Sequence, residues 1–78
     1  MKTGDRVIIT CDGEQYAGHI ILASSNEVSL MLGFEAIIDG HVGMMPVLRG
    51  NDGVYRSLFT SVEIGIRPWT PDARVRTP

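Results

Sequence analysis

The sequence predicts an all-β protein, built as one five-stranded, strongly bent antiparallel barrel followed by an irregular C-terminal tail. Its 78 residues are enough for one small domain. Apolar residues recur mostly with period two, and turn-forming residues interrupt them about every eight to twelve positions, which is typical of consecutive short strands. An open sheet of this size would leave two unprotected edges, and closure into a barrel removes them.

Composition narrows the class of protein further. The chain is 44% apolar and 21% charged, with a net charge of −2, values that favour a packed globular domain over disorder. Its longest apolar runs fall far short of the roughly 20 residues that cross a bilayer, and the N-terminus lacks the pattern of a secretory signal. We therefore expect a cytoplasmic chain with no membrane partner. The single Cys11 forms no intrachain disulfide, so packing must hold the fold.

The first two strands are predicted on either side of a tight hairpin. Val7 and Ile9 share one face of the segment Asp5–Thr10. The pair Asp12-Gly13 then tolerates the positive φ angles that a two-residue hairpin turn requires. A second strand is expected over Gln15–Ala23, and Ser24-Ser25-Asn26 forms the next turn.

The third strand has the clearest alternation in the chain. Its apolar face is predicted to supply the centre of the core, because each large side chain contributes about 1.5–3 kcal/mol when it is fully buried. The opposite face is small or soft, which allows another surface to approach closely. The four predicted core residues are Val28, Leu30, Leu32 and Phe34.

The next segments are less regular. Glu35–Ile38 either continues the third strand or forms a short excursion before Asp39-Gly40. A fourth strand is predicted over Met44–Leu48, and Pro46 within it belongs at an edge or a bulge because proline has no N–H donor.

The last part of the predicted barrel begins with a loop. Arg49–Gly53 is that loop, Val54–Ser57 follows it, and Leu58–Ser61 is compatible with a single helical turn. The final strand carries Val62, Ile64 and Ile66 on one face. We place the barrel domain at residues 1–67 and a Pro-rich tail at 68–78, which holds three of the four prolines.

The order of these features resembles the SH3-like small barrels, an architecture shared with Sm-like RNA-binding proteins. Gly4-Asp5-Arg6-Val7 opens the first strand, and the resemblance covers residues 4–67. Asp12-Gly13 with Gly18 is similar to the first Sm motif, and Leu48-Arg49-Gly50-Asn51 is similar to the Arg-Gly turn of the second. The Asp and Asn of the first motif have no matching counterparts, so the resemblance implies the barrel rather than the uridine pocket.

A second resemblance concerns the opening of the chain. Gly4-Asp5-Arg6-Val7 followed by Gly13–Ile20 is similar to the start of the type II dihydrofolate reductases, which are tetrameric barrels. The Val-Gln-Ile-Tyr segment that lines their shared pore is missing here. The resemblance therefore implies a barrel that assembles, and it leaves open an enzyme whose site exists only at subunit boundaries.

The residue types that carry chemistry are sparse and dispersed. His19 and His41 belong to no close group of metal-ligating residues. Cys11 has no neighbouring base in the sequence that would activate a thiol. We predict no catalytic residue, no metal site and no cofactor.

Two segments are predicted to contact a partner. Alternation buries only one of Met44 and Met45, so the other is left for a partner. Pro46 belongs to the same predicted contact segment. Trp69 lies in the irregular tail and either caps its own barrel or docks on a neighbouring chain. A chain this short has a small core, and oligomerisation is a common remedy.

Nucleic-acid binding is the main alternative. Arg49 and Arg56 would contact phosphates, and Tyr55 would stack on a base. The net charge of −2 disfavours this, because no long-range field gathers a polyanion. The sequence therefore predicts a non-catalytic interaction or assembly module that forms a homo-oligomer or binds a protein partner. A nucleic-acid-binding module and an enzyme with a subunit-boundary site remain the alternatives.

Overall fold

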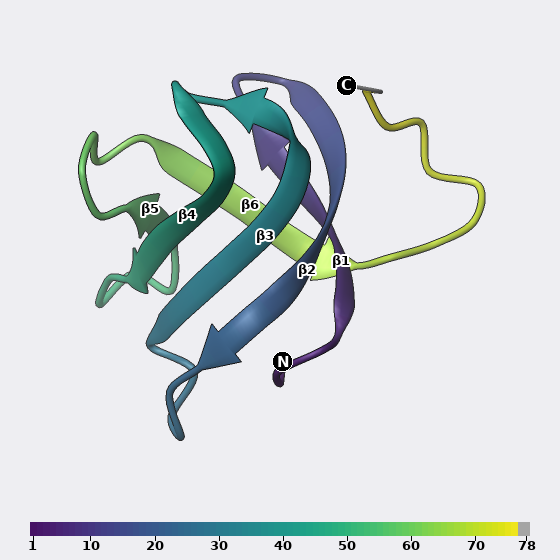
Figure 1. Cartoon of the computed structure of the whole chain (residues 1–78). Helices are drawn as coiled ribbons and strands as arrows, with labels where there is room; N and C mark the ends of the chain where they lie inside the picture. Colours follow the sequence, from purple (N-terminus) through teal and green to yellow (C-terminus); the bar gives the residue numbers. More distant parts are fainter. Residues whose placement is uncertain (77–78) are drawn as a thin grey trace.

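The computed structural model describes residues 1–76 and consists of antiparallel strands closed into one barrel (Figure 1). Each strand pairs with its sequence neighbours, and β1 pairs with β6 to close the barrel. The predicted all-β antiparallel barrel is confirmed. The strands are β1 (Arg6–Cys11), β2 (Glu14–Ala23), β3 (Ser29–Ile38), β4 (His41–Arg49), β5 (Tyr55–Ser57) and β6 (Glu63–Pro68).

The barrel has six strands rather than the predicted five. The additional strand is β5, which pairs Tyr55 with Arg49 of β4 and with Ile64 of β6. Its three residues are too few to produce a visible alternation in the sequence. This strand is defined by its hydrogen-bonded pairing with β4 and β6, which the alternation of apolar and polar residues in the sequence does not reveal.

Tight turns join the first two strands and the third and fourth. Asp12 and Gly13 have φ angles of 50° and 80°, which confirms the predicted hairpin. Asp39 and Gly40 have φ angles of 51° and 76°, so a second turn of the same kind follows β3. Glu35–Ile38 therefore continues the third strand, and β4 begins at His41, before the predicted start at Met44.

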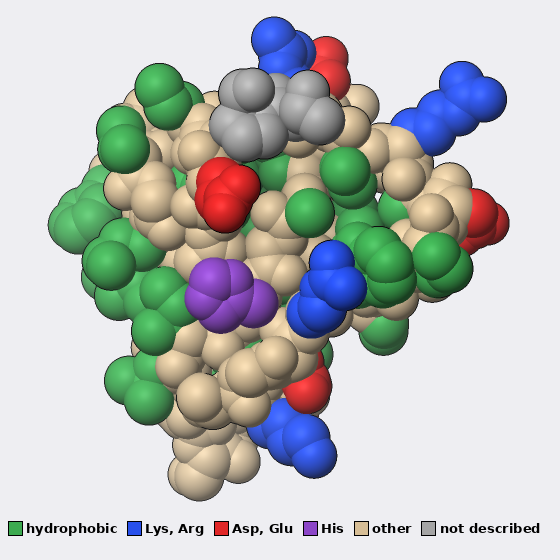
Figure 2. Space-filling model, turned by 45° about the vertical axis from the view of Figure 1, so that its right-hand side comes forward, with side chains coloured by type: hydrophobic (Ala, Val, Ile, Leu, Met, Phe, Trp, Pro, Cys, Tyr) green, Lys and Arg blue, Asp and Glu red, His purple; other side chains and the backbone are tan. Residues whose placement is uncertain are grey.

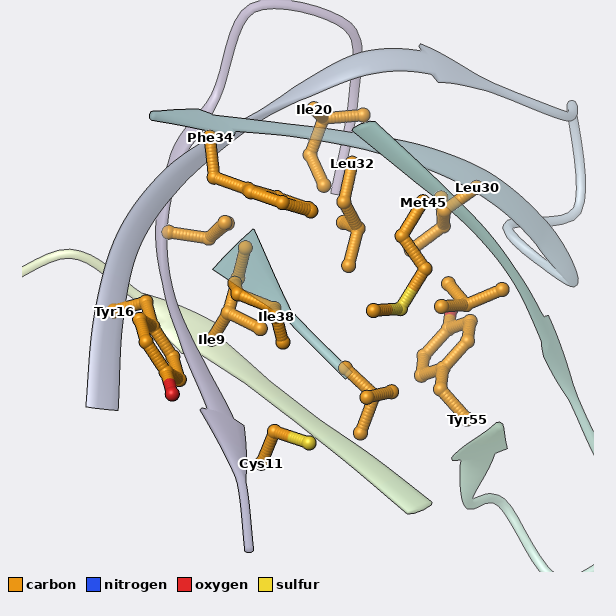
Figure 3. Packing of buried hydrophobic residues seen from close by; sticks show 13 residues of the cluster. Ile9, Cys11, Tyr16, Ile20, Leu30, Leu32, Phe34, Ile38, Met45 and Tyr55 are labelled. Carbon is orange, nitrogen blue, oxygen red and sulfur yellow. The ribbon is translucent and has the colours of Figure 1, made fainter. Parts of the chain in front are cut away.

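The core is formed by the inward faces of all six strands. Leu30, Leu32 and Phe34 of β3 are buried, whereas Val28 precedes the strand and is only half-buried. Figure 3 shows Leu32 and Phe34 pointing into the same interior as Met45 of β4. The fully or nearly buried cluster comprises Val7, Ile9, Cys11, Tyr16, Ile20, Leu30, Leu32, Phe34, Ile38, Met45, Val47, Tyr55 and Ile64.

The segment between β5 and β6 is a turn and not a helix. The Ser61 N–H donates to the Ser57 carbonyl over 2.9 Å, and the Ser57 hydroxyl accepts from the N–H groups of Phe59 and Thr60. Ser61 has a φ of 63°, which ends the turn before a second helical bond forms. The predicted single helical turn at Leu58–Ser61 is therefore present as one i+4 to i hydrogen bond, and it does not continue into a helix.

The tail returns to the barrel after β6. The Trp69 N–H donates to the Arg6 carbonyl over 3.2 Å, and the Arg76 N–H donates to the Gln15 carbonyl over 2.6 Å. Figure 1 shows this segment leaving β6 and returning toward the start of β2, where Arg76 forms a bridge with Tyr16. The described part of the tail is irregular, as the sequence predicts, and it is bonded to the barrel at Trp69 and at Arg76.

Candidate interaction surface

The outward side of β2, β3 and β4 carries an unusual number of apolar side chains. Register places them side by side: Leu22 lies opposite Met31, Met31 opposite Pro46, and Ile37 opposite Val42. Ile37 is 66% exposed and Val42 is 75% exposed. We call this surface the outer apolar face and define it as Ile21, Leu22, Met31, Ile37, Val42, Met44, Pro46 and Leu48.

A β-bulge in β2 enlarges this face. Ile20 pairs with Leu32, and Leu22 pairs with Met31, so Ile21 is an extra residue between two paired ones. Ile20 points into the core, whereas Ile21 and Leu22 are both exposed. The bulge therefore places two consecutive large side chains on the outside, where strict alternation would place one.

Figure 2 shows apolar side chains gathered along the left of the view. The strands β3 and β4, which lie at the front and left of Figure 1, turn toward this side in Figure 2. The patch continues into the turn after β5, because the ring of the exposed Phe59 stacks on His41 with 5.8 Å between centroids. Contiguous apolar patches of this kind mark interaction surfaces in proteins.

The predicted methionine contact divides between core and surface. Met44 is 53% exposed and lies opposite Gly33 on the outer apolar face, whereas Met45 is 0% exposed and packs in the core. Alternation therefore places one methionine inside, as expected, and Met45 is not accessible to a partner. Pro46 is half-buried and lies opposite Met31 on the outer face.

Trp69 lies apart from the methionines. Its ring packs under the Arg6 guanidinium, with the Arg6 Cζ 4.0 Å from the ring centroid, and a shallow pocket beside it includes Met1 and Val7. The barrel order puts β1 and β6 away from β3 and β4. The two predicted contact segments therefore do not form one cleft.

The residues predicted to contact nucleic acid do lie together, but other groups of the chain already engage them. Arg49 donates to the Asn26 carbonyl over 3.2 Å, and its Cζ lies 5.9 Å from the centroid of Tyr55. Tyr55 itself is buried, and its hydroxyl bonds to the Glu27 carbonyl. Only the edges of this cluster face solvent.

Arg56 is paired with two carboxylates. It binds Asp52 over 2.9 Å and Glu63 over 3.4 Å. Hydrogen bonds from Arg56 lower the pKa of Asp52 to about 2, so Asp52 stays ionised and offsets the Arg56 charge. The cluster therefore presents no excess of positive charge to a phosphate backbone.

Among the described residues, neither the Cys11 thiol nor the acidic and histidine side chains form an arrangement typical of a catalytic or metal site. Burial, followed by the charges of Asp12 and Asp39, raises the pKa of the Cys11 thiol, the opposite of what a nucleophile requires. Among residues 1–76, no cluster of three or more His, Cys, Asp and Glu side chains is placed to hold a metal ion. The same residues include no helix with the length and apolar character needed to span a bilayer.

One feature escaped sequence reasoning: a shallow cleft of about 660 Å³ along β2, beside the tail. Gly18 and Gly33 form part of its lining, together with His19, Val75 and Arg76. A Cβ on Gly18 would lie 2.7 Å from the Gly33 carbonyl oxygen, so the two strands approach closely there. Isolated glycines within two strand patterns were the available signal.

Comparison of the chain with protein-family models, with curated proteins and with solved structures gives no match. A role for the chain is therefore inferred from its own surfaces.

Proposed function

We propose that the chain is a non-catalytic assembly module, which forms a homo-oligomer by packing the outer apolar faces of two copies together. The observation that carries this proposal is the contiguous row of exposed apolar side chains across β2, β3 and β4. In water these side chains lose the stabilisation of about 25 cal/mol per Å² that burial would give them. Contact with a like surface recovers it.

The size of the face suits a second copy. The chain exposes 4874 Å², and a standard protein interface covers about 800 Å² on each partner, roughly one sixth of that surface. Three adjacent strands of a six-stranded barrel offer an area of this order. The two methylene-rich side chains Met31 and Met44 adapt their shape easily, which favours a self-complementary contact.

Charge also favours self-association over a charged partner. Along the outward positions of β3 and β4, from Ser29 to Leu48, Glu35 is the one charged side chain. A net charge of −2 per chain produces little repulsion between copies. A strongly acidic partner would find no complementary charge along these positions, and a strongly basic partner would find Glu35 alone.

The experiment compares the mass of the assembly in matched variants by light scattering. Met44→Lys places a charge at the centre of the outer apolar face, and we expect it to weaken association at least about tenfold, or about 1.4 kcal/mol. Asn51→Lys, which makes the same change of charge in an exposed loop, serves as the control and should keep the wild-type mass. Equal masses for both variants and the wild type, with intact folds, would refute the placement of the interface.

We also propose that the barrel belongs to the SH3-like group and acts in the cytoplasm. The closed six-stranded antiparallel barrel, its tight hairpins and the single turn before the last strand support the first assignment. The carboxylate partners of Arg56 count against a polyanion ligand. The raised pKa of Cys11 counts against thiol catalysis.

A further inference from the structure

We propose that the outer side of β1 and the start of β2 form a second binding site, which accepts an extended peptide segment of a partner protein. The segment would carry an apolar residue followed by a basic one. Val75 and Arg76 of the chain's own tail occupy this site as an internal ligand. The site does not involve Met44, the residue that the assembly test changes, although its cleft shares Ile21 with the outer apolar face. The backbone contact at Gln15 and the ion pair at Glu14 lie outside that face, so the inference is tested separately from the proposed assembly.

The site exists because β2 and β3 diverge. Their pairing begins at Gly18 and Phe34, although β2 begins at Glu14 and β3 continues to Ile38. The first four residues of β2 therefore have β1 on one side and no β3 partner on the other. Unpaired strand edges of this kind add a further strand through main-chain hydrogen bonds.

The tail uses this edge. The Arg76 N–H donates to the Gln15 carbonyl over 2.6 Å, and Arg76 forms a parallel bridge with Tyr16. The Arg76 guanidinium lies 3.5 Å from the Glu14 carboxylate. A ligand at this position thus supplies one backbone donor and one positive charge.

Burial of Ile8 provides a second, independent observation. Ile8 lies on the opposite face of β1 from the core residues Val7 and Ile9, and it does not belong to the core cluster, yet it is 0% exposed. Trp69 of the tail is bonded to Arg6 and Arg76 to Gln15, and Ile8 lies between these two points on β1 and β2, so we infer that the tail covers its outer side. An apolar surface under an irregular segment is the arrangement of a docked peptide.

The cleft beside the tail leaves room for a longer ligand. It has a volume of about 660 Å³ and lies against Val75, Ala17 and Glu35. A partner segment would replace the tail on Gln15 and could extend along this cleft. Because the tail is attached to the barrel, it competes for the site at an effective concentration in the millimolar range. A partner segment binds only if its affinity overcomes this competition, or if the contacts of the tail have been weakened.

The test titrates the full ¹⁵N-labelled chain with a synthetic peptide of residues 70–76, Thr-Pro-Asp-Ala-Arg-Val-Arg, and follows amide shifts by NMR. Arg76→Pro removes the N–H donor of the internal ligand and keeps the segment extended. Arg76→Ala keeps the donor and serves as the matched control. We expect the peptide to bind the Arg76→Pro chain at least fivefold more tightly than the wild type, with shifts at Ile8 and Gln15–Ala17.

Two further measurements make the result decisive. A peptide ending in Pro instead of Arg should bind the Arg76→Pro chain at least fivefold more weakly than the original peptide. In the wild-type chain the Arg76 amide should exchange with solvent at least tenfold more slowly than in the free peptide. Equal affinity for both peptides, absent shifts at Gln15–Ala17, or free-peptide exchange at Arg76 would each overturn the proposal.

Discussion

The Arg6 guanidinium lies 4.0 Å from the centre of the Trp69 ring, and the backbones of the same two residues are joined by a hydrogen bond of 3.2 Å. Side chain and main chain together fix the point where the tail leaves β6. This relationship places the Trp69 ring against Arg6 of its own chain, beside β1.

Replacing Trp69 with Ala should therefore destabilise the monomeric barrel. The cation–π contact contributes about 0.5–1 kcal/mol at an exposed site, and loss of packing adds to this. Urea denaturation should give a free energy of unfolding about 1 kcal/mol lower than that of the wild type. Trp69→Phe keeps a ring beneath Arg6 and should lose less, and an unaltered stability for Trp69→Ala would contradict this role.

Two glycines of neighbouring strands should respond differently to alanine. A Cβ on Gly18 would lie 2.5 Å from Ile9 Cδ1 and 2.7 Å from the Gly33 carbonyl oxygen, a buried side chain and a backbone atom that have little room to move. Gly18→Ala should lower the free energy of unfolding by about 1–3 kcal/mol.

Gly33→Ala is the matched comparison. Its Cβ would meet the ring edge of His19 at 2.6 Å and the Ile21 methyl at 2.9 Å, both at the ends of exposed side chains that can turn away. We expect a smaller loss than for Gly18→Ala. Equal losses in urea denaturation would show that His19 and Ile21 are held rigidly.

Much of the barrel could be predicted from the sequence because alternation reports burial directly. Leu30, Leu32 and Phe34 are buried, and Asp12-Gly13 forms the hairpin. Contacts between segments that are distant in the sequence could not be predicted from this alternation. Ile8 is buried although the pattern of β1 points it outward, and a tail some sixty residues later returns to bond with Arg6 and Gln15 on either side of it.

The candidate sites were predicted less completely, for the same physical reason. Alternation shows that one of Met44 and Met45 faces outward, but only the pairing of Met45 with the buried Leu32 decides which. Tyr55 is an exposed base-stacking candidate in the sequence and a buried core residue in the fold. The apolar run Ile20-Ile21-Leu22 breaks the alternation in the sequence, but only the pairing with β3 shows that this break is a bulge that exposes both Ile21 and Leu22.

The Cys11 thiol should be protected from alkylation. It is buried, and burial together with the neighbouring Asp12 and Asp39 raises its pKa, so little thiolate exists near neutral pH. Iodoacetamide should react at least tenfold more slowly with the native chain than with the chain in urea. Asp12→Asn removes one of the charges and should raise the native rate; a native rate equal to that in urea would contradict the burial of this residue.

Acid should weaken the loop before β5 through Asp52. The pKa of this carboxyl falls from 3.8 to about 2 in the folded chain, chiefly through hydrogen bonds from Arg56. A lowered folded pKa gives stability that is present above pH 4 and lost as the pH falls through about 2. Asp52→Asn should therefore be less stable than the wild type at pH 5, and the difference should shrink toward pH 2. A constant difference across this range would contradict the pairing.

Sedimentation equilibrium of the full wild-type chain tests the central claim most directly, because mass reports self-association without any assumption about the interface. One chain has a mass of 8.5 kDa. If like outer faces hold copies together, the measured mass is twice that value or a higher multiple, and it falls toward one chain on dilution. A mass of 8.5 kDa at every concentration would contradict the account.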